Sequence, residues 1–153
     1  MSLKSNVLLA LFIAAAPTAA WAGTIAPDDV KFEEESIAMS LTGEPGDAVR
    51  GREVFANRKL GNCLACHVNS EMKEQLFHGE VGPPLDGAAD RWEEAELRAI
   101  VVNSKVVLGD ETIMPSFYRV KNGARPAEKF EGKTILSAQD VEDVVAYLGT
   151  LKE

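Results

Sequence analysis

The stretch Cys63-Leu64-Ala65-Cys66-His67 decides how this sequence is interpreted, because it holds the only two cysteines of the 153-residue chain. Two thiols three positions apart, followed at once by a histidine, form the C-x-x-C-H pattern of covalent haem attachment. On a short helical turn both thiols lie on one side, where each can bond to a haem vinyl group, and the imidazole below them can reach the iron. The stretch therefore predicts one covalent haem c, held by Cys63 and Cys66, with His67 as an axial ligand.

Three other uses of the two cysteines compete with haem attachment. A redox-active pair of thioredoxin type belongs at the start of a helix that follows a strand, whereas residues 55–62 are basic and polar. A zinc site needs four ligands, and beyond this stretch the chain offers only His78 and carboxylates. A structural disulfide across two intervening residues is strained. The haem interpretation is favoured over all three.

A sixth iron ligand is expected from a methionine or from the second histidine. Met114 lies far enough after His67 for the chain to pass round the haem and present a thioether from the opposite face, and Pro115 favours an extended backbone at Met114. Met72 is too close to His67 to cross the haem, and Met39 precedes the first predicted helix. Met114 is therefore the predicted sixth ligand, with His78 as the alternative.

Helical patterns predict an all-α fold. Asp47 is a candidate N-cap for a helix that ends near Arg58, with Val49, Val54 and Phe55 as its apolar positions. A second helix is predicted over residues 93–102, where Leu97, Ile100 and Val101 have helical spacing. The clearest helix follows the N-cap Ser137, with Asp140 at its third position, and runs to Leu148. The long segment between the second and third helices has no pattern of its own and is expected to be held by the haem.

The first 22 residues have the composition of an export signal. Lys4 precedes the apolar run Val7–Ala16, and Ala20-Trp21-Ala22 is a small-residue cleavage site. The run is too short to span the ~30 Å hydrocarbon core of a membrane, so we expect cleavage after Ala22, release into the periplasm and no membrane insertion. The formal net charge of −8 argues against a nucleic-acid partner, which requires a basic face.

The remaining chain divides into two parts. Residues 23–46 are predicted to be an N-terminal extension, because Pro27, a run of acidic residues and the loop Thr42–Gly46 interrupt any helical pattern. This extension is expected to lie outside the core and to offer its apolar residues to a partner. Residues 47–153 form the predicted domain.

Four motifs together resemble class I cytochrome c: the Cys63–His67 stretch, Gly82-Pro83-Pro84-Leu85, Met114-Pro115 and Val145-Ala146-Tyr147-Leu148. The resemblance implies a few helices wrapped around one haem. It also implies that the carbonyl of Pro83 accepts a hydrogen bond from His67, as an acceptor carbonyl in that loop could do, and that Arg91 binds a haem propionate. Gly51 and Phe55 of the first helix would cross Tyr147 of the last.

Within this family, residues 114–120 and 132–148 are most similar to SoxX, the small mono-haem subunits of the SoxAX cytochromes of thiosulfate oxidation. The resemblance implies a heterodimer with a SoxA-type cytochrome subunit that acts as an L-cysteine S-thiosulfotransferase, joining thiosulfate to a cysteine of the carrier SoxYZ. This chain, without catalytic residues of its own, would pass the released electrons to a soluble cytochrome c. A stand-alone periplasmic electron shuttle and a haem enzyme or gas sensor with an open distal site are the alternatives.

Overall fold

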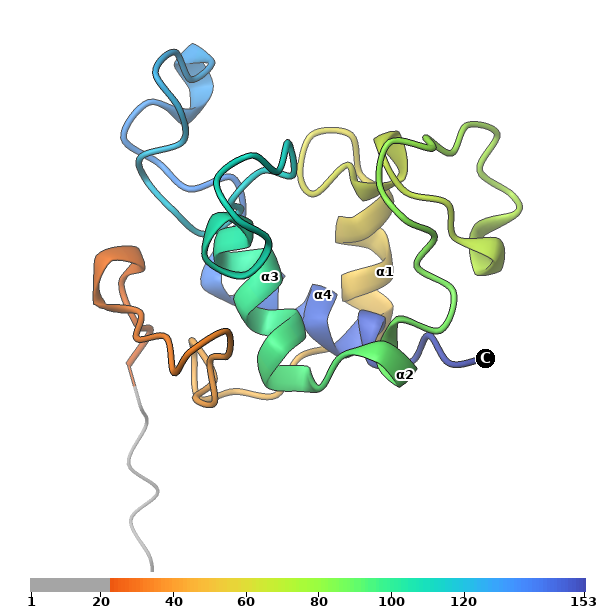
Figure 1. Ribbon diagram of the computed structural model, residues 1–153, viewed down its shortest axis with the longest axis horizontal. Coiled ribbons are helices and arrows are strands. Elements are labelled where there is room, and N and C mark those ends of the chain that lie inside the picture. Colours follow the sequence, from red (N-terminus) through yellow and green to blue (C-terminus); the bar gives the residue numbers. More distant parts are fainter. Residues whose placement is uncertain (1–22) are drawn as a thin grey trace, which may run out of the picture.

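The computed structural model describes residues 23–153, so the predicted export signal and its cleavage site lie outside the described residues. Four α-helices follow one another along this part of the chain (Figure 1): α1 (Ala48–Ala56), α2 (Ala88–Arg91), α3 (Glu94–Leu108) and α4 (Ala138–Leu148). Extended pairing within residues 23–153 is limited to one isolated bridge, Glu33 with Ser36. The predicted all-α fold is confirmed. No helix in this range is long and apolar enough to cross a membrane.

Helix α1 begins where the sequence predicts. The side chain of Asp47 accepts hydrogen bonds from the backbone N–H groups of Val49 and Arg50 at 2.8 and 3.3 Å, which satisfies two of the free donors at the helix start. The helix ends two residues before the predicted Arg58. Phe55 is buried as predicted, but Val49 is 74% exposed, so its assignment to the apolar face is wrong.

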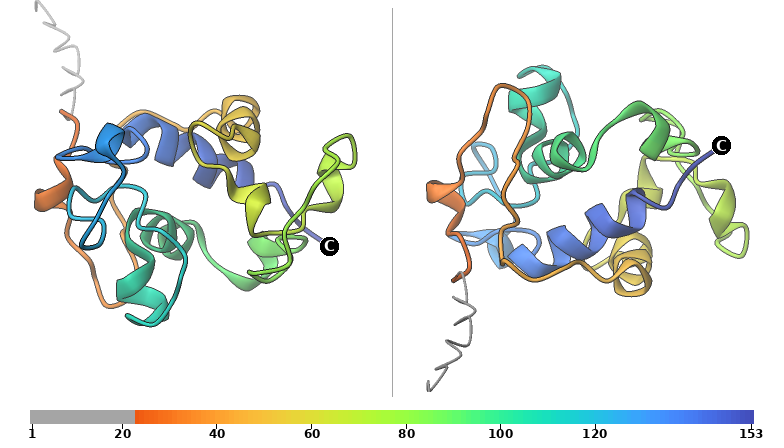
Figure 2. Two further views of the ribbon diagram at one scale, coloured as in Figure 1. Left: turned by 90° about the horizontal axis from the view of Figure 1, so that it is seen from above. Right: turned by 90° about the horizontal axis from the view of Figure 1, so that it is seen from below.

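Helix α4 packs across α1, and the two lie side by side in both views of Figure 2. Ser137 and Asp140 form the predicted capping box. At the crossing, the rings of Phe55 and Tyr147 meet edge to face, with their centroids 5.5 Å apart. The hydroxyl of Tyr147 accepts a hydrogen bond from the buried Asn69 amide at 2.8 Å, so the polar tip of this ring has a partner inside the core.

Helix α3 is longer than predicted and has a kink. It starts with a capping box between Glu93 and Glu96 and continues to Leu108, but Asn103 has non-helical backbone angles (φ −149°, ψ 85°). The segment that follows was expected to be held by the haem alone. The protein holds it as well, because Phe117, Tyr118 and Leu136 are buried in the core.

The N-terminal segment, residues 23–46, precedes the helices as predicted but does not lie outside the core. Ile37 is 2% exposed and Leu41 is fully buried. The N–H of Ile37 donates to the carbonyl of Ala95 in α3 at 3.0 Å, and the N–H of Leu41 donates to the Glu142 carboxylate in α4 at 2.8 Å. The expectation that the apolar residues of this segment are free for a partner is therefore wrong for Ile37 and Leu41.

Candidate functional site

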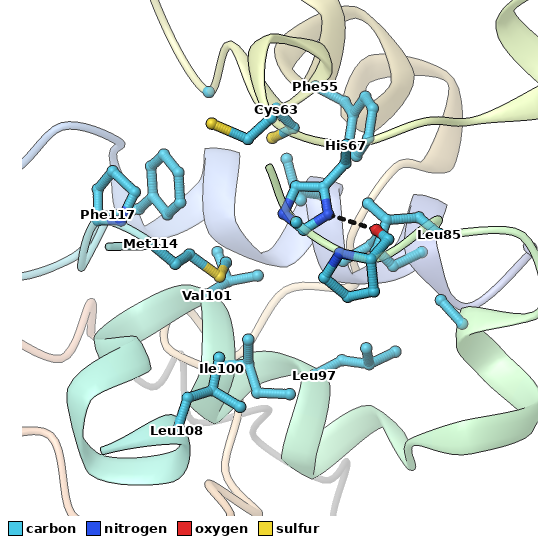
Figure 3. Close-up of a pocket in the computed structure, with 18 of the residues that line it drawn as sticks. Phe55, Cys63, His67, Leu85, Leu97, Ile100, Val101, Leu108, Met114 and Phe117 are labelled. Carbon is cyan, nitrogen blue, oxygen red and sulfur yellow. Dashed lines mark hydrogen bonds between the residues drawn. The ribbon is translucent and has the colours of Figure 1, made fainter. Parts of the chain in front are cut away.

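A cavity of about 390 Å³ lies at the centre of the described fold. Its walls come from the Cys63–His67 turn, the loop Val81–Leu85, helix α3 and the segment Thr112–Phe117, with α4 behind them (Figure 3). The walls consist mostly of carbon, contributed in part by Leu97, Ile100, Val101, Leu136, Val144 and Leu148. The cavity is therefore suited to a large apolar group that also needs a few polar contacts at defined points.

The two cysteines enter the cavity from a tight turn. Asn62 adopts a left-handed conformation (φ 50°, ψ 35°) and leads into a 3-10 turn over Cys63–Ala65, in which the N–H groups of Cys66 and His67 both donate to the carbonyl of Cys63. The structure contains no disulfide between Cys63 and Cys66. Burial raises the pKa of the Cys63 thiol to about 12, whereas a redox-active cysteine of thioredoxin type needs a lowered pKa.

His67 is held in one orientation. Its Nδ1 lies 2.7 Å from the carbonyl oxygen of Pro83, which confirms the predicted contact. A carbonyl can only accept, so Nδ1 carries the proton and the lone pair of Nε2 is free to bind iron. Gly82 makes room for the ring, because a Cβ at this position would collide with the imidazole.

Met114 faces His67 across the cavity. Figure 3 shows its sulfur atom pointing into the space below the imidazole. His78, the alternative, is not among the residues that line the cavity. Its Nδ1 accepts from the N–H of Asn69 and its Nε2 lies beside the carbonyl of Met72, both at 3.2 Å. The structure therefore contradicts His78 as a sixth ligand.

The other two methionines within residues 23–153 are also poorly placed. Met72 is fully buried in the core away from the cavity, and Met39 is 68% exposed on the N-terminal segment. Met114 is thus the methionine that the fold brings to the cavity, in agreement with the spacing argument from the sequence.

These side chains suit a haem c. The site combines two neighbouring thiols, an imidazole with a fixed proton, a thioether on the opposite wall and apolar surroundings, which is the donor set of a covalently attached haem with histidine and methionine ligands. Within residues 23–153, no group of three or more His, Cys, Asp or Glu side chains could hold a metal ion. The zinc alternative therefore has no ligand set in this part of the chain.

Comparison with known proteins decides the family. The family model for cytochrome c matches residues 48–152. The chain belongs to the cytochrome c family. A chain in a crystal structure of SoxXA is similar to it over most of its length, so it is more closely a SoxX-like class I cytochrome with one covalent haem c.

Two solved structures are similar to this chain. The crystal structure of SoxXA from P. pantotrophus contains a chain that is 45% identical, with a TM-score of 0.79; the match covers 86% of this cytochrome and 100% of that chain. Ferric cytochrome c-550 from Paracoccus versutus is 22% identical, with a TM-score of 0.39 and coverage of 71% and 99%. The comparison with curated proteins gives no match.

Arg91 lies at the edge of the cavity of this cytochrome. Its guanidinium donates to the carbonyls of Asp86 at 2.6 Å and Pro84 at 2.9 Å, and so braces the loop that carries Pro83. Because a guanidinium has five N–H groups, these two contacts leave donors for an anion. The expected bond between Arg91 and a haem propionate stays a prediction.

Sequence reasoning missed several cavity residues of the cytochrome, among them Trp92, Phe117 and Leu136. Trp92 directly follows Arg91, and Phe117 lies three positions after Met114. Both residues could therefore have been predicted to line the cavity because they lie close in sequence to a predicted site residue. The apolar residues of the second and third predicted helices were not predicted to line the site. In the structure, Leu97 and Leu148 serve both helix packing and the cavity wall.

Proposed function

We propose that this cytochrome is the electron-transfer subunit of a SoxXA-type complex. The observation that carries the proposal is the cavity in which the His67 imidazole and the Met114 thioether face each other. Cys63 and Cys66 provide the two thioether links to haem, and His67 and Met114 provide the axial ligands. The 45% identity to a chain of SoxXA supports a SoxA-type subunit as the partner.

The ligand set favours electron transfer over bond-forming chemistry. The haem supplies one reversible electron, and its potential is raised by a thioether ligand relative to two nitrogen ligands. With both axial positions filled, no position remains for a substrate on iron, which argues against a haem enzyme or gas sensor. Both thiols are consumed by the haem links, so the chain keeps no cysteine nucleophile.

The proposed reaction takes place on the partner chains. A cysteine thiol of SoxYZ and thiosulfate form an S–S bond, giving an S-thiosulfonate, two electrons and one proton. The complex is then an L-cysteine S-thiosulfotransferase in which this chain is the non-catalytic subunit. This chain would pass the electrons, one at a time, to a soluble cytochrome c. An export signal cleaved after Ala22 would place these reactions in the periplasm.

The proposal is tested by mixing the ferric holoprotein with a SoxA-type subunit, SoxYZ and thiosulfate, and following reduction by visible absorption. We expect two equivalents of reduced cytochrome for each thiosulfate consumed, and no reduction when SoxYZ or the SoxA-type subunit is left out. Reduction that needs neither protein, or a complete mixture that stays oxidised, would contradict the proposal.

A stand-alone periplasmic shuttle is the second candidate, and one observation favours it. A free shuttle has little use for an N-terminal segment that binds a partner. In this chain, however, Ile37 and Leu41 of that segment pack on the chain's own core. Purification from the native host separates the two functions. A second haem protein that elutes with this chain in gel filtration supports the complex, and elution as a monomer supports the shuttle.

A further inference from the structure

The kink in α3 joins this helix to the chain beside Met114. In a straight helix the carbonyls of Val101 and Val102 would accept from N–H groups four residues later. At the kink these two carbonyls accept from the N–H groups of Phe117 at 3.1 Å and Tyr118 at 3.2 Å. The backbone at Asn103 is irregular, and backbone carbonyls of α3 therefore bind the segment that follows Met114, the proposed sixth ligand.

Three consecutive side chains at the kink add further contacts. Ser104, which is fully buried, donates from Oγ to the carbonyl of Met114 at 2.7 Å. The Lys105 ammonium donates to the same carbonyl at 3.2 Å and also to the carbonyl of Thr112. Asn103 accepts at Oδ1 from the hydroxyl of Ser116 at 2.8 Å. Asn103, Ser104 and Lys105 thus bind the segment on both sides of Met114.

The segment needs such contacts because it has no regular structure of its own. Pro115 lacks an N–H group, and the N–H of Met114 reaches only the side chain of Thr112, at 3.3 Å. The carbonyl of Met114, by contrast, receives two donors, one of them charged. Hydrogen bonds from a charged donor are about twice as strong as those between neutral groups, so Lys105 is well suited to fix this carbonyl.

We propose that Ser104 and Lys105 are positioning residues for the sixth ligand: by fixing the Met114 carbonyl they keep its thioether in place against competing ligands. The inference rests on the proposed role of Met114. A thioether binds ferric iron more weakly than an imidazole does, so its place depends on how firmly the protein holds its backbone.

Imidazole titration of the ferric holoprotein tests this role, because added imidazole must displace Met114 to bind. The near-infrared band of a methionine–iron bond reports the displacement. We expect Lys105→Met to tighten apparent imidazole binding by about tenfold, the factor that matches one charged hydrogen bond, and Ser104→Ala by roughly twofold to tenfold. Lys105→Arg, which keeps the charge and the donors, should stay near the wild-type value.

Two further variants are controls: one should have no effect on imidazole binding, and the other should have the largest effect. Lys121→Met removes an exposed lysine from the loop after Tyr118 and should leave the affinity unchanged. Met114→Ala removes the thioether and should give the tightest binding, without the near-infrared band.

Two results would overturn the inference. If the wild type has the band but Ser104→Ala and Lys105→Met bind imidazole like Lys121→Met, the positioning role fails while Met114 remains the ligand. If the wild-type protein lacks the band, the assignment of Met114 fails and the positioning role fails with it.

Discussion

Gly82 makes the histidine side of the haem site possible at the scale of a single residue. Its N–H donates to the carbonyl of Cys66 at 2.8 Å, and the space where a Cβ would stand is filled by the His67 imidazole. The next residue, Pro83, then presents its carbonyl to Nδ1. A hydrogen bond of this kind orients the ring and would raise the basicity of Nε2 toward iron in the proposed ligation.

Gly82→Ala should therefore push the His67 ring away from Pro83. We expect the free energy of unfolding to fall by about 1–3 kcal/mol, the usual effect of overpacking, and part of the haem to become high-spin because the iron–imidazole bond weakens. Denaturant unfolding and the visible spectrum of the ferric holoprotein measure the two effects. Gly149→Ala is the matched control, since its Cβ would meet its nearest atoms only at 3.4 Å. Equal stability and low-spin spectra for both variants would refute this account.

The crossing of α1 and α4 is the strongest contact between helices among the described residues, and it also depends on a glycine. Gly51 lies against the carbonyl of Asp143, so closely that a Cβ would collide with backbone atoms. The close approach lets the rings of Phe55 and Tyr147 meet at the crossing.

At the scale of elements, Gly51→Ala should force α1 and α4 apart. In an exposed helix interior a change from glycine to alanine stabilises by about 0.5–1 kcal/mol. Here we expect a loss of about 1–3 kcal/mol, because the collision is with backbone that cannot rotate away. Thermal unfolding monitored by circular dichroism is the measurement. Val49→Ala, on the exposed side of α1, should change stability by less than about 0.5 kcal/mol, and a stabilised Gly51→Ala protein would refute the tight crossing.

Across the whole molecule, a buried ion pair connects three parts of the chain that are far apart in sequence. Arg98 in α3 and Glu142 in α4 are bonded at 3.0 Å, with each side chain only 4% exposed. Arg98 also donates to the carbonyl of Ile37, and Glu142 accepts from the N–H of Leu41. The pair therefore supplies the backbone partners that allow the N-terminal segment to be buried on the two helices.

Arg98→Met should release the N-terminal segment. Removal of one partner leaves the Glu142 carboxylate buried without its counter-charge, and we expect a loss of about 3–5 kcal/mol in the free energy of unfolding. Limited proteolysis should then cut within residues 23–46 before any other part of the chain. Arg50→Met is the control, because Arg50 is half-exposed and its pairs with Glu53 and Asp140 are each worth about 0–1 kcal/mol. An N-terminal segment that stays resistant in the Arg98→Met protein would count against this role.

The predictions that the structure confirms depend on short stretches of sequence. Asp47 and Ser137 cap their helices through bonds to residues two or three positions away, so the sequence is enough to locate them. The extension of α3 beyond residue 102 was not predictable. Asn103 departs from helical angles there, and the carbonyls before it bond to Phe117 and Tyr118, residues that no local pattern connects to the helix.

The sequence by itself predicted the haem chemistry: Cys63, Cys66 and His67 lie within one short stretch, and the motifs of Pro83 and Met114 are short and specific. Residues so close in sequence keep their spacing in any fold, which explains why the attachment could be predicted before the structure was known. Only the tertiary structure decided that His78 is occupied elsewhere and that Ile37 and Leu41 are buried. Burial of those two residues depends on the pair of Arg98 and Glu142, which lie far apart in the chain and meet only when α3 packs on α4.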